Sequence, residues 1–137
     1  MIVGEHLANI FQFPAIVFFV QPTGFLCRSR LSCKARAEAQ QNAACNAVHD
    51  GSSRLCRWLL HCADRTGSDQ LLLTQDFLAG MLGIRRTTVT LLAQEVQKRG
   101  VVRYGRGRIT ILDRRGMEAC ACECYQAVKK LSLKAGS

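Results

Sequence analysis

Residues 73–89, Leu73-Thr-Gln-Asp-Phe-Leu-Ala-Gly-Met-Leu-Gly-Ile-Arg-Arg-Thr-Thr-Val89, carry the strongest structural signal in this chain of 137 residues. Thr74 is a typical N-cap for a first helix, and Gly83 is a typical residue to end it. Arg85 or Arg86 then begins a second helix. Because two helices joined by a short turn containing glycine form a helix-turn-helix, this stretch predicts that motif.

The second helix is amphipathic and leads into a β-hairpin. One buried helical face is predicted from the spacing of Val89, Leu92, Ala93 and Val96, and the helix ends at Gly100. Residues 101–104 and 108–112 read as strands joined by Gly105-Arg106-Gly107, whose glycines can adopt positive φ. Asp113 is then expected to cap one last helix, with a core stripe of Met117, Ala121, Cys124, Val128 and Leu131.

Two helices are predicted upstream of the motif. Residues 34–48 are rich in good helix formers and carry a small apolar stripe of Ala37, Ala44, Cys45 and Val48. Ser52 or Ser53 is expected to cap the next helix, which ends at residues 66–68. Its buried face is predicted at Leu55, Trp58, Leu59 and Cys62. Residues 71–73 suit an edge strand, so the whole order predicts a mainly α fold with a small β-hairpin, a winged helix-turn-helix.

Positive charge is concentrated in one segment of the chain. The sequence has 19 basic and 10 acidic side chains, for a net charge of +9, and residues 85–115 contribute +7 of it. A solvated helical face usually pairs its basic residues with acidic ones, but this segment holds only Glu95 and Asp113. Such a surface indicates a polyanionic partner, and we expect double-stranded DNA.

Candidate DNA contacts follow from the geometry of the motif. The N-terminal residues of the second helix reach base edges in the major groove, where Arg86 could contact a guanine through two hydrogen bonds. Arg106, at the tip of the wing, would reach the adjacent backbone or minor groove. The candidate set is Thr74, Arg85, Arg86, Thr87, Thr88, Thr90, Leu91, Gln94, Lys98, Arg106 and Arg108. The alternative is a motif used only for packing, with solvated arginines.

Residues 1–33 are not assigned to a domain. No residue from Leu7 to Leu26 is charged, but Pro14 and Pro22 break any helix that would cross a membrane. A signal peptide would have a basic start, where this chain has Glu5. We therefore expect a cytoplasmic protein with no membrane partner. A membrane-tethered or inactive remnant is the alternative.

Several segments resemble the DNA-binding domain of Crp/Fnr-type bacterial transcription regulators. Residues 73–89 and 100–112 carry the main resemblance, and residues 118–125 are similar to the closing helix of one subgroup. Residues 43–49 and 54–60 resemble the family's junction with its long dimerisation helix. The resemblance implies promoter binding, usually as a homodimer, with RNA polymerase as a further partner. It divides the chain into a dimerisation-helix remnant at 34–50, a winged helix-turn-helix domain at 51–131 and a tail at 132–137.

The sequence departs from the family pattern in two ways. Arg86 falls where the family often has a base-reading arginine, but Thr87 stands where the best-known members have glutamate, and Leu91 where they have arginine. We therefore expect a different target sequence. Members also carry an N-terminal sensor barrel, for which residues 1–34 leave no room. Either the chain works without a sensor, or it is the C-terminal part of a longer product.

The cysteines avoid the segment that we expect to face DNA. The 8 positions are Cys27, Cys33, Cys45, Cys56, Cys62, Cys120, Cys122 and Cys124, and we expect free thiols. On one continuous helix, Cys122 would point away from Cys120 and Cys124, so no metal site or cofactor is expected. The alternative is a thiol-responsive or metal-responsive regulator with zinc or an iron–sulfur cluster, using His49 or His61 as further ligands. No catalytic constellation is present, so no enzymatic activity is expected.

Overall fold

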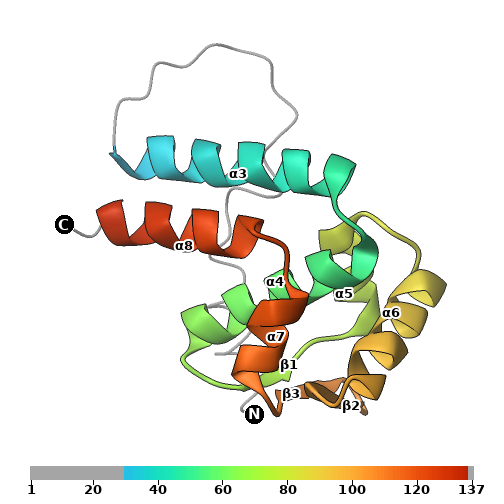
Figure 1. Cartoon of the computed structure of the whole chain (residues 1–137). Coiled ribbons are helices and arrows are strands. Elements are labelled where there is room, and N and C mark those ends of the chain that lie inside the picture. The colour runs from blue at the N-terminus through green and yellow to red at the C-terminus, as the bar shows by residue number, and fades with distance from the viewer. Residues whose placement is uncertain (1–29, 136–137) are drawn as a thin grey trace, which may run out of the picture.

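The computed structural model describes residues 30–135 (Figure 1). The elements in chain order are α3 Arg30–Val48, α4 Gly51–Thr66, β1 Gln70–Leu72, α5 Gln75–Leu82, α6 Arg86–Lys98, β2 Val102–Gly105, β3 Arg108–Ile111, α7 Arg114–Cys120 and α8 Cys124–Ala135. The expectations for residues 1–29 and 136–137 lie outside the described residues. Between residues 30 and 135, no helix is both long enough and apolar enough to cross a membrane. The fold is the expected mainly α winged helix-turn-helix.

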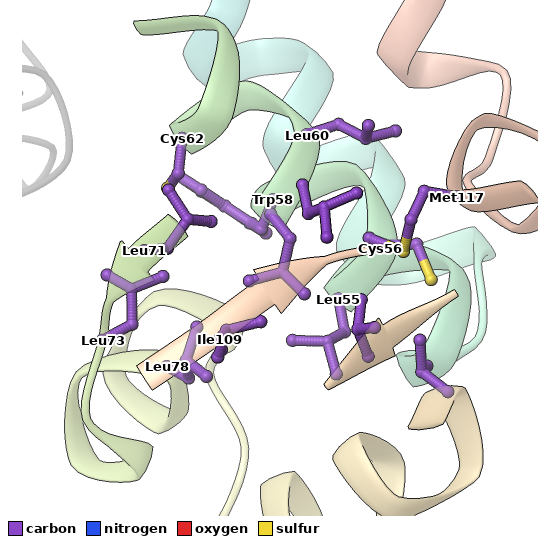
Figure 2. Packing of buried hydrophobic residues seen from close by; sticks show 14 of the residues in the cluster. Leu55, Cys56, Trp58, Leu60, Cys62, Leu71, Leu73, Leu78, Ile109 and Met117 are labelled. Atoms are coloured by element: carbon purple, nitrogen blue, oxygen red, sulfur yellow. The ribbon is translucent and has the colours of Figure 1, made fainter. Parts of the chain in front are cut away.

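Helix α4 supplies the centre of the core. The predicted buried face is confirmed, since Leu55, Trp58, Leu59 and Cys62 are all buried. Figure 2 shows Leu55 and Trp58 among side chains from the sheet and the neighbouring helices, with Leu71, Leu78, Ile109 and Met117 in the same cluster. Burial of such side chains contributes about 1.5–3 kcal/mol each, so α4 is the support on which the other elements are positioned.

The helix-turn-helix forms as the sequence predicts. The hydroxyl of Thr74 accepts a hydrogen bond from the backbone N–H of Phe77 at 3.2 Å, which caps α5. Gly83 ends α5 in the left-handed region, with a φ of 65°. The buried guanidinium of Arg54, on α4, donates to the carbonyl of Leu82. The last turn of α5 is thereby fixed to α4, and this contact sets the start of the turn before α6.

The wing is part of a three-stranded antiparallel sheet in the order β1-β3-β2. β1 lies at an edge, as predicted, and pairs Leu71 with Ile109. The hairpin turn differs from the expectation, because Arg106 and Gly107 take positive φ, at 50° and 72°, and Gly105 does not. Gly105 is paired with Arg108 across the strands, so the turn is a two-residue connection of the kind that needs positive φ at both positions.

Two predicted helix boundaries are wrong. Asp50, rather than Ser52 or Ser53, caps α4, and its carboxylate accepts from the backbone N–H of Ser53 at 3.1 Å. The single last helix is instead two helices, because α7 ends with Ala121 in an extended conformation. The break turns Cys122 and Cys124 toward the same side, where both are buried.

Helix α8 then lies beside α3, running in the opposite direction, on a side of the molecule away from α6 and the wing (Figure 1). The stripes predicted for these helices are only partly buried. Leu131 is 37% exposed on α8, and Ala44 and Val48 are exposed on α3, which buries Cys45. Asp113 precedes α7 but makes no side-chain cap. Both helices extend beyond the expected limits, with α3 starting at Arg30 and α8 ending at Ala135.

Candidate nucleic-acid interface

Helix α6 has one buried face and one exposed face. Val89, Ala93 and Val96 are buried, and Leu92 is half-buried. Most candidate contacts on α6 and at its start are exposed, namely Arg85, Arg86, Thr87, Leu91, Gln94 and Lys98. Thr88 and Thr90 are half-buried. The side chain of Leu91 is apolar and 65% exposed, so it is available for contact on this face.

Arg86 is held at the start of α6 by two residues of α5. Its guanidinium lies 3.5 Å from the carboxylate of Asp76, and its Nε donates to the side-chain carbonyl of Gln75 at 3.4 Å. The Arg86 side chain is nevertheless 65% exposed. Gln75 and Asp76 were not among the predicted site residues. Their position directly after the Thr74 cap, in the first turn of α5, was the signal that could have found them.

Two predicted hydroxyls are already used within the helices. The Thr90 hydroxyl donates to the carbonyl of Arg86 at 3.2 Å, and Thr74 serves as the α5 cap. Thr74 is exposed, so its other lone pair and its proton face solvent. These two side chains are therefore less free to reorient toward a ligand than Thr87.

The wing is fixed to α6 by Gln97, which was not among the predicted site residues. The amide oxygen of Gln97 accepts a hydrogen bond from the backbone N–H of Tyr104, on β2, at 2.8 Å. Arg106 and Arg108, both exposed, follow this anchored strand. Nothing in the sequence pattern separates Gln97 from the other polar residues of α6, so only the fold identifies it.

The acidic residue of α6, Glu95, is engaged by neighbouring side chains. Glu95 accepts from the hydroxyl of Ser52 at 2.8 Å and pairs with Arg99 at 2.7 Å. Arg114 lies among Asp64, Asp69 and Glu118. These two arginines are thus paired with acids. The other basic side chains of the segment are all exposed, namely Arg85, Arg86, Lys98, Arg103, Arg106, Arg108 and Arg115, with Arg86 near Asp76.

A second group of polar side chains lies on the α3–α8 side. Cys45, His49, Cys122 and Cys124 place their sulfur and nitrogen atoms within 4.8 Å of one another. Burial raises the pKa of the Cys122 thiol to about 12, with the neighbouring Cys45 thiol adding to the effect. The prediction that Cys122 points away from Cys124 is wrong, because it assumed one continuous helix.

Comparison with protein families shows what this arrangement is similar to. Residues 53–120 match the family model described as a Crp-like helix-turn-helix domain. The comparison with curated protein sequences yields no match.

Solved structures with the same fold come from bacterial regulators. A protein described as a transcriptional regulator of the crp/fnr family from Eubacterium rectale is 26% identical, with a TM-score of 0.61, over 66% of this chain and 42% of its own. A CRP/FNR family transcriptional regulator from Thermus thermophilus is 29% identical, with a TM-score of 0.60, over 65% and 49%. A second regulator from that organism is 17% identical with a TM-score of 0.59, and shares the fold. The chain thus spans less than half the length of the first two.

Proposed function

Because residues 53–120 form a Crp-like helix-turn-helix domain of the Crp/Fnr type, we propose that the chain binds duplex DNA at specific sequences and regulates transcription. Helix α6 enters the major groove, and the wing formed by β2 and β3 contacts the backbone. The observation that carries the proposal is the exposed face of α6, which presents Arg86 in its first turn while Glu95 is tied back toward α4.

Arg86 reads a base in this proposal. Its pairing with Asp76 joins two exposed side chains, at 65% and 72% exposure, and such pairs contribute about 0–1 kcal/mol. A bidentate contact from arginine to guanine discriminates by about 1–3 kcal/mol. The contact with guanine is therefore strong enough to draw the guanidinium away from Asp76. In the absence of DNA, Asp76 and Gln75 hold the guanidinium at the start of α6.

The other candidate side chains have distinct roles. Leu91 offers an apolar contact to a thymine methyl, which accounts for its exposure, and Gln94 can pair with adenine through two hydrogen bonds. Thr87 and Thr88 contact a base edge or the phosphate at the helix start. Phosphate contacts are assigned to Thr74, Arg85, Lys98, Arg106 and Arg108, and to Thr90 once its hydroxyl releases the carbonyl of Arg86. These phosphate contacts position the domain without selecting a sequence.

Homodimerisation and contact with RNA polymerase belong to the same proposal through the family resemblance. The exposed Ala44 and Val48 on α3 offer small apolar side chains to a second copy of the chain. A dimer would bind two half-sites about one helical turn apart, so the operator would be an inverted repeat.

The test is selection of binding sites from a random duplex library, with wild-type protein and two variants. The wild type should enrich one motif, and Arg86→Ala should lose the preference at one base pair of it. Lys130→Ala removes the same charge at an exposed position of α8, and this variant should keep the wild-type motif. Absence of any enriched motif, or an Arg86→Ala motif identical to that of the wild type, would contradict the proposal.

A further inference from the structure

The four side chains grouped on the α3–α8 side come from two separate parts of the chain. Cys45 and His49 are four residues apart at the end of α3, where a backbone hydrogen bond from His49 to Cys45 of 3.0 Å continues the helical turn. That spacing places both on one helix face. Cys122 and Cys124 flank Glu123 where α7 gives way to α8. The break after Cys120 therefore brings two pairs of donor residues face to face.

The distances within this group suit a single tetrahedral ion. The sulfurs of Cys45 and Cys122 are 3.5 Å apart, and the Cys124 sulfur lies 3.6 Å from Nδ1 of His49. With Zn–S near 2.3 Å and Zn–N near 2.05 Å, a regular tetrahedron separates two sulfurs by about 3.8 Å, and sulfur from nitrogen by about 3.6 Å. All four donor atoms lie within 4.8 Å of one another. Small side-chain rotations would bring the longest pair to the tetrahedral value.

Hydrogen bonds around the group orient two of its members as metal ligands are oriented. Nε2 of His49 lies 3.0 Å from the carboxylate of Glu123, which leaves Nδ1 to face the sulfurs. A carboxylate on the second nitrogen of a liganding histidine is the usual support for zinc. The side-chain amide of Gln41 donates to the Cys124 sulfur at 3.0 Å, as a thiolate would require.

A buried cation provides an independent observation. Arg57 is 1% exposed, and it donates from Nη1 to the side-chain oxygen of Asn42, on α3, at 2.7 Å. Within residues 30–135, its Nε and Nη2 atoms have no hydrogen-bond partner. Burial raises the pKa of the Cys45 thiol, and the Arg57 guanidinium acts in the opposite direction. A buried charge needs a counter-charge, and Zn²⁺ with three thiolates and a neutral imidazole carries a net charge of −1.

We propose that Cys45, His49, Cys122 and Cys124 bind one Zn²⁺ ion, which joins the end of α3 to the junction between α7 and α8. The site is closed, with four protein ligands and buried sulfurs, so its role is structural rather than catalytic. It fixes the helix that precedes the DNA-binding domain to the helix that follows it. An iron–sulfur cluster fits less well, because ligands on separate iron atoms lie further apart than these donors.

The same three thiols also form a small cluster of their own, separate from the main core. Cysteines used only as small apolar residues would not need a histidine held by a carboxylate or a buried arginine beside them. Those two features distinguish this group from Cys62, which lies in the main core among apolar neighbours. Cys62 is therefore the matched control for loss of a buried thiol.

The test is the metal content of the full chain, purified under reducing conditions without chelator and measured by mass spectrometry. We expect about one zinc ion per chain and, after exchange with Co²⁺, the absorption of a tetrahedral site with thiolate ligands. Cys122→Ser should lose the metal. Cys62→Ser should keep it, as should a Cys27→Ser and Cys33→Ser double variant.

A gentler variant keeps the test valid if Cys122→Ser fails to fold. Glu123 is exposed, so Glu123→Gln should fold normally, yet it should weaken zinc binding about 10–100-fold in a competition with a chromophoric chelator. The proposal is overturned by any of four results: folded protein that binds no added zinc, a disulfide between Cys45 and Cys122 in its place, iron with acid-labile sulfide, or zinc affinity unchanged in both Cys122→Ser and Glu123→Gln.

Discussion

The two ends of this molecule use their polar residues in opposite ways. On α6 and the wing, the basic side chains are exposed, and the acidic Glu95 is bound to Ser52. On the α3–α8 side, polar side chains are buried and face one another, as with Cys45 and Cys122 at 3.5 Å. An exposed basic surface suits a large external anion, whereas a buried set of thiols suits a small ion that stays within the protein.

The two regions also depend on different parts of the fold. Arg86 is positioned by Gln75 and Asp76, which lie on the preceding helix, 11 and 10 residues earlier in the chain. The cysteine group needs residues 77 positions apart to meet, so it depends on the packing of α3 against α8. A change in one region should therefore leave the other largely intact, and the predictions below test that separation.

Zinc is expected to have the largest effect on stability. A ligand that binds only the folded state adds about 4 kcal/mol when its free concentration is 1,000 times its dissociation constant. Urea unfolding in zinc-buffered solution, compared with excess chelator, should show this gain for the wild type and for Arg86→Ala. The gain should be absent from Cys122→Ser. An equal effect of zinc on Cys122→Ser would show that the ion binds elsewhere.

Arg86→Ala should have the complementary effect. Loss of a contact to guanine costs about 1–3 kcal/mol, or roughly fivefold to more than a hundredfold in affinity for the selected duplex. Unfolding free energy should change by no more than about 0.5 kcal/mol, because the side chain is exposed. Fluorescence anisotropy and urea unfolding measure the two quantities. A strongly destabilised Arg86→Ala variant that keeps its affinity for the duplex would contradict the assignment of Arg86 to DNA binding.

The α4–α8 contact should make stability depend on pH. Burial lowers the pKa of His61 to about 4, and its ring packs 5.1 Å from that of Tyr125. The nearby Arg57, Arg65 and Lys129 lower it further, while Asp64 acts in the opposite direction.

As the pH falls, His61 is protonated in the unfolded state at a higher pH than in the folded state. The stability that the neutral, buried His61 contributes is therefore full above about pH 6.5 and is lost as the pH falls toward 4. Between pH 7 and 5 the loss should be about 2 kcal/mol, measured by urea unfolding with chelator present. His61→Leu should remove most of that dependence. An unchanged pH profile in His61→Leu would assign the effect to other groups.

The wing should show the smallest effects. Arg106→Ala removes one phosphate contact, so binding should weaken similarly for all sequences, and the salt dependence of log K should fall by about 1. Arg106→Gly removes the same charge but also the cost of a side chain at a φ of 50°, and should stabilise the fold by about 1 kcal/mol relative to Arg106→Ala. Equal stability of these two variants would show that the turn is not strained.

The sequence predicted the helix-turn-helix because its signals are local. The Thr74 cap, the Gly83 ending and the spacing of Val89, Ala93 and Val96 all act within a few residues, and the structure confirms each of them. The last helix was predicted wrongly because nothing near Ala121 breaks a helix by propensity. The break goes together with a contact between Cys122 and distant Cys45, and a pattern along the chain does not contain such a contact.

The same distinction applies to the interface. Exposed residues of α6 follow from its periodicity, but the Gln97 contact to the wing and the Asp76 contact to Arg86 join different elements. The count of positive charge on residues 85–115 was right as a sum. It could not show that Arg114 is paired with acids, since Asp64 and Asp69 lie far away in the sequence, whereas the partner of Arg99 is Glu95, four residues before it.

DNA binding by α6 and the wing is tested most directly by mapping the backbone amide NMR shifts of the full chain as a selected duplex is added. We predict that the largest shifts fall on α6, on the start of α5 and on the turn between β2 and β3. Residues of α3 and α8 should shift little. Shifts centred on α3 and α8, with α6 unaffected, would contradict the account.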